Sequence, residues 1–176
     1  MNFLPGWMPG GATLFALDYP EVEATNTSAV TAVTTVHTVN LPASIAAGDL
    51  LIAAFSMFGT GGTAATPTNW DLLLTDSSTS GASSGRLYVF RKVATGSEGA
   101  SVAVTTTSNT ISAHTTYRIA GYSGTPEETH TTGADANPNP PTLSPSWGST
   151  KTLWLVISGS FRSSAAHAVT AYPTNY

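Results

Sequence analysis

The ionisable side chains that could perform chemistry are few in this 176-residue chain, and the sequence does not group them. The chain has four histidines: His37, His114, His130 and His167. None has a second histidine or a carboxylate at metal-ligand spacing on one expected element. Glu127, Glu128 and His130 form the densest group, but they lack the Asp-x-Asp-x-Asp-Gly pattern of a calcium loop. We therefore expect no metal site and no cofactor.

Residues for nucleophilic or acid–base catalysis are equally dispersed. No Gly-x-Ser-x-Gly motif lies between an expected strand and a helix, and the serines fall in low-complexity stretches. A glycosidase needs two facing carboxylates. They could come from Asp49, Asp71, Asp76 and Glu98, but the spacing selects no pair and most of these positions are typical of turns. We predict that the protein is not an enzyme, and a glycan hydrolase domain is the catalytic alternative.

Three tryptophans, Trp70, Trp147 and Trp154, could stack on sugar rings. Trp154 lies inside an apolar run and Trp70 begins an expected strand, so we expect both in the core. Trp147 follows Pro145 and precedes Gly148, in a sequence typical of a surface turn. It is therefore the candidate for contact with a glycan.

The elements that must position these residues are organised around a motif that occurs twice. An apolar run at 50–58 is followed by a loop and Pro-Thr-Asn-Trp at 67–70, and a run of equal length at 153–161 is followed by a loop and Pro-Thr-Asn-Tyr at 173–176. Each run is apolar at both alternating positions, which is typical of a central strand covered on two sides. We predict two pseudo-equivalent central strands of one β-sandwich.

The remaining sequence predicts further strands at 29–41, 70–75, 86–93, 102–105 and 111–119, because each is rich in β-branched or alternating apolar residues. In the last of these, alternation places Ile111, Ala113, Tyr117 and Ile119 inward. It places Ser112, His114, Thr116 and Arg118 outward, as a solvated polar face. We expect a loop at 76–85 and a long crossover or functional loop at 121–145. The predicted fold class is an all-β, antiparallel, jelly-roll-like β-sandwich.

Residues 1–28 differ in composition from the rest and predict an extended N-terminal arm before a sandwich domain at 29–176. Four large apolar side chains, Phe3, Leu4, Trp7 and Met8, lie among prolines and glycines there. Burying each would stabilise the protein by about 1.5–3 kcal/mol. We therefore expect the arm to bind a partner subunit, with packing on its own domain as the alternative.

Composition restricts the classes of partner. Charged residues make up 9% of the chain, against about 25% in typical soluble domains, and the net charge is −4. A nucleic-acid partner is not expected, because it requires a basic surface. A membrane partner is not expected either, because no run reaches the ~18 apolar residues of a span. The chain contains no cysteine, which favours assembly in a reducing cytoplasm.

The segment 40–53, Asn-Leu-Pro-Ala-Ser-Ile-Ala-Ala-Gly-Asp-Leu-Leu-Ile-Ala, resembles the opening of β-sandwich modules in virion proteins of tailed bacteriophages. In those modules a turn of this kind leads into a core strand and a later Pro-x-x-Trp. The resemblance continues through Trp70, through 86–98 and through 119–124. The shared positions are mainly those that determine a fold, so the resemblance implies no catalytic residues.

The resemblance implies a non-enzymatic structural part of a phage particle, assembled in the host cytoplasm and located on the virion surface. Our first expectation is a capsid decoration (cement) protein that forms a homo-oligomer, for which a trimer is suitable, and binds the major capsid protein. A head- or tail-fibre module and a carbohydrate-binding β-sandwich are the alternatives. The modules that it resembles continue beyond the motif at 173–176, so we also expect the sandwich to be incomplete at its C-terminal side.

Overall fold

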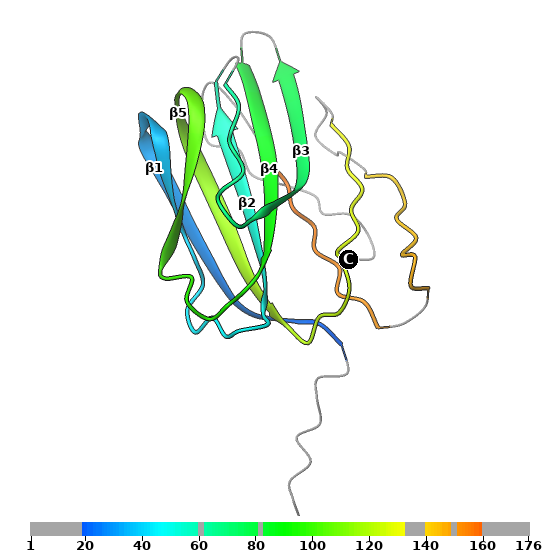
Figure 1. Cartoon of the computed structure of the whole chain (residues 1–176). Coiled ribbons are helices and arrows are strands. Elements are labelled where there is room, and N and C mark those ends of the chain that lie inside the picture. The colour runs from blue at the N-terminus through cyan, green and yellow to red at the C-terminus, as the bar shows by residue number, and fades with distance from the viewer. Residues whose placement is uncertain (1–18, 60–61, 81–82, 133–139, 149–150, 160–176) are drawn as a thin grey trace, which may run out of the picture.

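The computed structural model describes residues 19–59, 62–80, 83–132, 140–148 and 151–159. Within these residues five strands form one antiparallel sheet, and no helix occurs, so none is present that could span a membrane (Figure 1). The strands are β1 (Glu21–Asn40), β2 (Leu50–Phe58), β3 (Asp71–Ser80), β4 (Ser83–Val93) and β5 (Ser101–Ala120), in the spatial order β1-β5-β2-β4-β3. The all-β, antiparallel prediction is confirmed.

Strand β2 lies in the centre of the sheet, as its apolar pattern predicts. It pairs with β4 on one side and β5 on the other. Leu51, Phe55 and Met57 project from one of its faces into a buried cluster, whereas Leu50 and Ile52 project from the opposite face into a second cluster. Both faces of β2 are covered, which explains why the strand has no polar side.

Strands β3 and β4 form a tight hairpin that replaces the predicted loop at 76–85. β3 runs to Ser80 and β4 begins at Ser83, and the two are paired through Asp76↔Leu87 and Ser78↔Gly85. The loop prediction is wrong because serine and glycine in this stretch obscured a strand. β3 is an edge strand, and polar residues are common at edges because they discourage pairing with other molecules.

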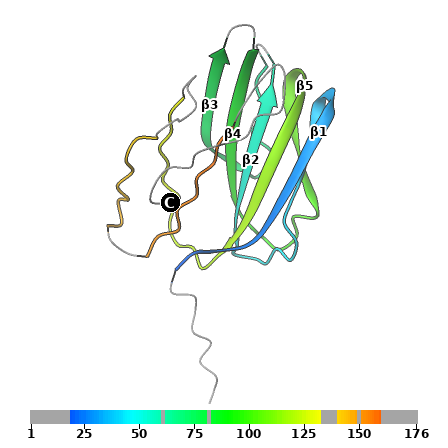
Figure 2. The same cartoon turned by 180° about the vertical axis from the view of Figure 1, so that it is seen from behind.

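Strands β1 and β5 are each 20 residues long and pair at both ends, from Glu21↔Ala120 to Val30↔Ser112 and from Val36↔Thr105 to Asn40↔Ser101. The pairing register shifts between Val30 and Val36, and in Figures 1 and 2 both strands turn over at the tip of the sheet and return. The returning half of β1 therefore lies near its first half. The Asn40 amide donates a hydrogen bond to Ser28 Oγ at 3.2 Å, and Asn26 Nδ2 donates one to the Leu41 carbonyl at 3.2 Å.

These two strands also change the boundaries expected from the sequence. β1 begins at Glu21, so residues 21–28, which we had assigned to the arm, are paired in the sheet. The two strands expected at 102–105 and 111–119 are parts of the single strand β5. Residues 1–18, which contain Phe3, Leu4, Trp7 and Met8, lie outside the described residues.

The sheet has a buried cluster on each face. On one face the cluster contains Phe55 and Phe90 of the sheet. Val39 and Val104, from the returning halves of β1 and β5, and Leu41, which follows β1, pack in the same cluster. On the other face, Leu50, Ile52, Val89 and Ile119 are covered by the segment 153–157. Figure 2 shows this segment running beside the sheet.

The second copy of the repeated motif is not a central strand, and that prediction is wrong. Residues 153–159 form no strand, and residues 160–161 lie outside the described part of the chain. Leu153, Leu155 and Ile157 pack against the sheet, whereas Trp154 and Val156 are each 45% exposed. The segment covers the sheet with one side only. Trp154 is therefore not in the core, while Trp70, 8% exposed, is buried as predicted.

Replacing Phe55 with alanine should lower the free energy of unfolding by about 3–5 kcal/mol, because its ring is completely buried and packs against three other rings. Chemical denaturation at pH 7.5 measures this change. Val33→Ala is the control, since Val33 is 71% exposed and its truncation should change stability by no more than about 0.5 kcal/mol. Equal effects of the two substitutions would contradict the assignment of the core.

Candidate functional site

The polar residues of β5 that we predicted to face solvent are buried. Ser112, His114 and Thr116 are 6%, 4% and 1% exposed, whereas Ile111 is 39% exposed. The alternation correctly separated the two faces of the strand, and Ile119 is buried as predicted, but the polar face is covered as well. The returning halves of β1 and β5 lie over the polar face, and the end of the other face is left open.

The buried polar residues form a continuous chain of hydrogen bonds between the two halves of β1 and β5. Ser28 Oγ lies 2.9 Å from His114 Nδ1, and His114 Nε2 lies 2.7 Å from Ser112 Oγ. Ser112 Oγ also lies 2.7 Å from His37 Nδ1, and His37 Nε2 lies 3.2 Å from Thr106 Oγ1. Sequence reasoning missed this chain because its members come from positions up to 86 residues apart.

The direction of the chain follows from the group at its end. Thr106 Oγ1 lies 2.9 Å from the Ser108 carbonyl, which can only accept, so the Thr106 hydroxyl donates there. The Thr106 oxygen must then accept from His37 Nε2–H. His37 Nδ1 consequently carries no proton and accepts from the Ser112 hydroxyl.

The same reasoning fixes the other half of the chain. Because the Ser112 proton is directed to His37, the Ser112 oxygen accepts from His114 Nε2–H. His114 Nδ1 then accepts from the Ser28 hydroxyl, and the Ser28 oxygen accepts from the Asn40 amide. Every donor and acceptor of the chain is used when both imidazoles are neutral.

Protonation of either histidine would break this arrangement. Burial lowers the pKa of His37, and burial together with the nearby His37 lowers the pKa of His114 to about 4. The rings are also packed against Phe55, which stacks on His114 at 5.2 Å and meets the edge of His37 at 5.3 Å. Both imidazoles are therefore neutral at pH 7.

The chain contains serine–histidine pairs that differ in their access to solvent. His37 is completely buried and Ser112 nearly so, leaving a substrate no access to them. The Ser28–His114 pair is more accessible, because Ser28 is half-buried and both residues line a pocket. The arrangement can hold the strands in one register, because buried polar groups need their specific partners.

The carboxylates considered for glycoside hydrolysis have separate partners. Asp49 pairs with Arg118 at 3.3 Å, Asp71 with Arg91 at 3.3 Å, and Glu98 with Lys92 at 3.5 Å. Arg118 also lies 3.8 Å from Glu23. The prediction that Arg118 faces solvent is wrong, because its side chain is only 15% exposed. Three of the four carboxylates therefore have different basic partners and hold different parts of the fold.

Glu98 closes a tight turn. Its carboxylate accepts hydrogen bonds from the Thr95 amide and hydroxyl and from the Gly96 amide, at 2.6, 2.9 and 3.0 Å. Burial alone would raise the pKa of Glu98, but these hydrogen bonds outweigh it and lower the pKa to about 2. Gly96 has φ +85°, and a Cβ there would lie 3.2 Å from the Ala47 amide nitrogen, so this turn requires glycine.

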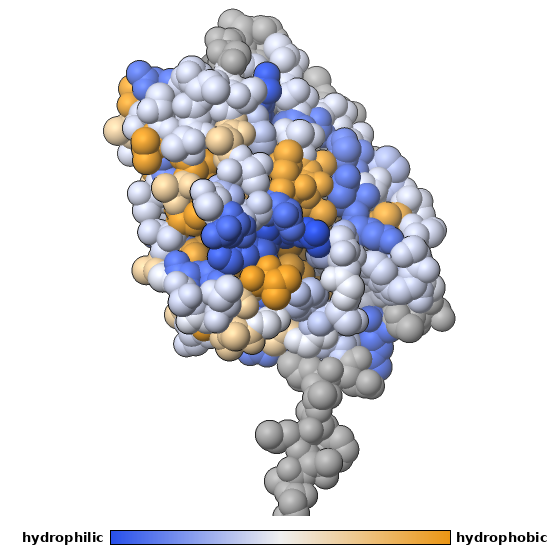
Figure 3. Space-filling view, in the orientation of Figure 1, coloured by the Kyte–Doolittle hydropathy of each residue, from blue (hydrophilic) through white to orange (hydrophobic). Residues whose placement is uncertain are grey.

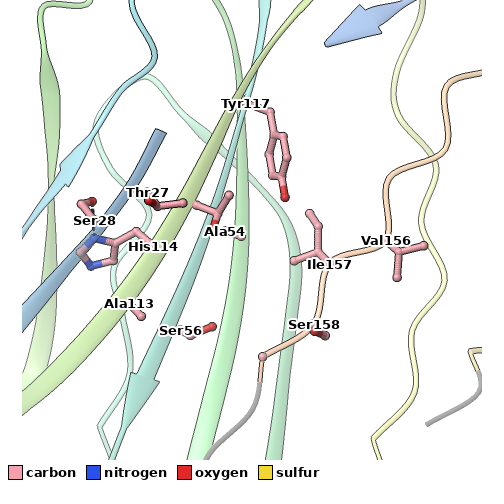
Figure 4. Close-up of a pocket in the computed structure, with 12 residues that line it drawn as sticks. Thr27, Ser28, Ala54, Ser56, Ala113, His114, Tyr117, Val156, Ile157 and Ser158 are labelled. Atoms are coloured by element: carbon pink, nitrogen blue, oxygen red, sulfur yellow. Dashed lines mark hydrogen bonds between the residues drawn. The ribbon is translucent and has the colours of Figure 1, made fainter. Parts of the chain in front are cut away.

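An open pocket of about 460 Å³ lies between the sheet and the segment 156–159. The sheet contributes small side chains there, among them Ala54, Ser56 and Ala113. Earlier positions on the same face of β2 carry the larger Leu50 and Ile52. In Figure 4 Tyr117 projects toward Ile157, whereas the His114 ring lies on the other side of β5. Ser28 and His114, at one end of the hydrogen-bonded chain, are nevertheless among the residues that line the pocket.

The acidic group at 127–130 is a surface feature. His130 Nδ1 lies 3.0 Å from Glu128 Oε2, which raises the pKa of His130, and Glu127 accepts from the Ser146 amide at 2.9 Å. Across the described residues, no three His, Cys, Asp or Glu side chains come together as metal ligands would. His167 lies outside that part of the chain.

Trp147, the candidate glycan contact, is 41% exposed at the end of a turn closed by the Gly148 amide and the Pro145 carbonyl at 3.0 Å. Its indole Nε1 donates to Thr152 Oγ1 at 3.0 Å. The structure therefore places an oriented, accessible ring at this position.

Comparison with known proteins adds no relative: no family model, no curated protein and no solved structure matches the chain.

The stability of the protein should fall by about 3 kcal/mol between pH 6.5 and pH 4 because of His114. The unfolded chain takes up a proton near pH 6.5, whereas the folded chain resists it down to about pH 4, so acid favours unfolding in this window. Denaturation curves across this range measure the slope. His114→Gln should reduce it, leaving the smaller share of His37.

His130→Gln is the matched control, because His130 is on the surface and its pKa is raised rather than lowered. Its slope should keep the wild-type sign. Glu98 adds its own loss of stability only as pH falls from about 4.5 toward 2. A slope unchanged by His114→Gln would refute the neutral, buried state of this histidine.

Proposed function

We propose that the protein is a non-enzymatic structural protein of a tailed-phage particle, and specifically a capsid decoration protein anchored by its N-terminal arm. The proposal includes a homo-oligomeric state, the major capsid protein as partner and a position on the virion surface. A head- or tail-fibre module is the alternative within the same class.

The observation that carries the proposal is the position of the segments with phage-like sequence. Residues from 40–53 and 86–98 meet at adjoining turns, where the Gly48 amide donates to the Ala94 carbonyl at 2.9 Å and the Ala94 amide donates to the Asp49 carbonyl at 2.8 Å. The third segment joins them through the Leu50↔Ile119 pair. Three separate stretches of the resemblance thus form one structural unit, which supports a shared fold rather than chance similarity.

We also propose that the domain is a jelly-roll-like β-sandwich. Long paired strands that bend between two layers are typical of jelly rolls. Strands β1 and β5 supply such a pair, and their returning halves cover one face of the sheet. Ala64 forms a bridge with Thr106, which brings a third segment to this covering layer.

The surface supports a structural role in an assembly. Figure 3 shows a face that is mostly pale, with separate hydrophobic patches and with hydrophilic residues near its centre and along one side. Only 9% of the chain is charged. Such a surface provides little long-range electrostatic repulsion between neighbouring copies.

Deleting residues 1–11 should weaken binding to capsids by at least tenfold, because this removes Phe3, Leu4, Trp7 and Met8, each worth about 1.5–3 kcal/mol when buried. Co-sedimentation of the purified chain with capsids of the encoding phage that lack it measures this binding. The melting temperature of the deletion variant should remain near that of the full chain.

Two outcomes would overturn the decoration proposal. One is equal co-sedimentation of the full chain and the deletion variant. The other is an electron-microscopy image of native particles with the chain confined to a fibre, which would select the fibre alternative.

A further inference from the structure

The segment that covers the second face of the sheet exposes an aromatic surface on its outer side. From 153 to 159 the side chains alternate between half-buried and exposed, as in an extended chain. Leu155 packs on the sheet, while Trp154 and Val156 are each 45% exposed. Exposed apolar side chains that lie together are common where a surface binds a ligand.

Trp147 is bound to the start of the same segment. Its indole Nε1 donates to Thr152 Oγ1 at 3.0 Å, and the half-buried Thr152 precedes Trp154 by two residues. Positions two apart in an extended chain are separated by roughly 7 Å. Trp147 is therefore held beside the residue two positions before Trp154, and the hydrogen bond fixes the orientation of its indole.

A carboxylate adjoins this surface. Glu127 accepts a hydrogen bond from the amide of Ser146, the residue before Trp147. Hydrogen bonds from the Ser146 hydroxyl and from its amide lower the pKa of Glu127. The surface thus combines two aromatic faces with a hydroxyl and a carboxylate, which are the groups that contact the apolar faces and the hydroxyls of a sugar ring.

The size of the apolar area favours a sugar over a protein partner. A tryptophan has about 250 Å² of surface, so two rings exposed by 41% and 45% present roughly 200 Å². A stable protein interface buries about 800 Å² on each partner. Two rings with polar neighbours are enough for a few sugar units but form a small part of such an interface.

We propose that Trp147 and Trp154, with Thr152 and Glu127, form a binding site for a polysaccharide through stacking on sugar rings. None of these four residues belongs to the N-terminal arm, so the inference assigns glycan binding and particle attachment to different residues. The site would add adhesion to a cell-surface or environmental polysaccharide to the structural role.

The test is binding of the full chain to a printed array of microbial and mammalian polysaccharides, followed by titration of each glycan that binds. Trp147→Ala and Trp154→Ala should each weaken binding by about tenfold or more. Trp147→Phe should retain much of the binding, because it keeps a ring for stacking. Leu72→Ala is the matched control, since Leu72 is 44% exposed on β3 and outside this surface.

Absence of binding to every polysaccharide on the array would overturn the inference, and so would binding that both alanine variants retain. If the double variant binds no less glycan but loses co-sedimentation with capsids, the surface is a protein interface and the glycan site is refuted. Capsid binding that depends on residues 1–11 but not on the tryptophans would leave the decoration proposal intact in each case.

Discussion

The pairing of β1 with β5 is the constraint on which the rest of the structure depends. The two strands are each 20 residues long and are paired on both sides of a bend, and both bend back at the same end of the sheet. One pair of strands therefore supplies an edge of the sheet and most of the layer that covers it. A rigid core between these two layers requires that both strands bend at matching positions, so a slip in register would displace Val39 and Val104 from the cluster around Phe55.

The buried hydrogen-bonded chain lies across this bend. His37 comes from the returning half of β1, His114 from the other half of β5, and Ser112 joins them. Apolar residues could fill the same space, but they would tolerate a shifted pairing more readily. Hydrogen bonds with fixed direction accept one alignment only, so we interpret the chain as a device that selects the register of β1 and β5.

The sequence predicted the centre of the fold better than its borders. β2 and β4 were recognisable because both of their faces are apolar, and Trp70 was correctly placed in the core. The hairpin of β3 and β4 was missed because its residues are mostly serine, and a strand there depends on its partner rather than on its own propensity. The motif at 153–161 has the same apolar pattern as β2, yet its described residues pair with no strand, since a pattern does not say which backbone groups find partners.

The candidate sites also differ in how far the sequence could predict them. Trp147 could be selected from the turn residues around it, and the structure places an exposed ring there. The chain from Ser28 to Thr106 could not be predicted, because it depends on the layer that covers β5 and not on the local sequence. Alternation alone cannot tell which face of a strand will be covered, and β5 shows a polar face that becomes the interior.

The single direction of the hydroxyl–imidazole chain couples the tautomers of His37 and His114. The neighbouring group determines which atom accepts each hydroxyl proton. Reversing one hydrogen bond alone would therefore place two donors or two acceptors opposite each other. The two imidazoles must therefore exchange tautomers together or remain as they are. The Ser108 carbonyl at one end, which can only accept, therefore determines the tautomers of both histidines.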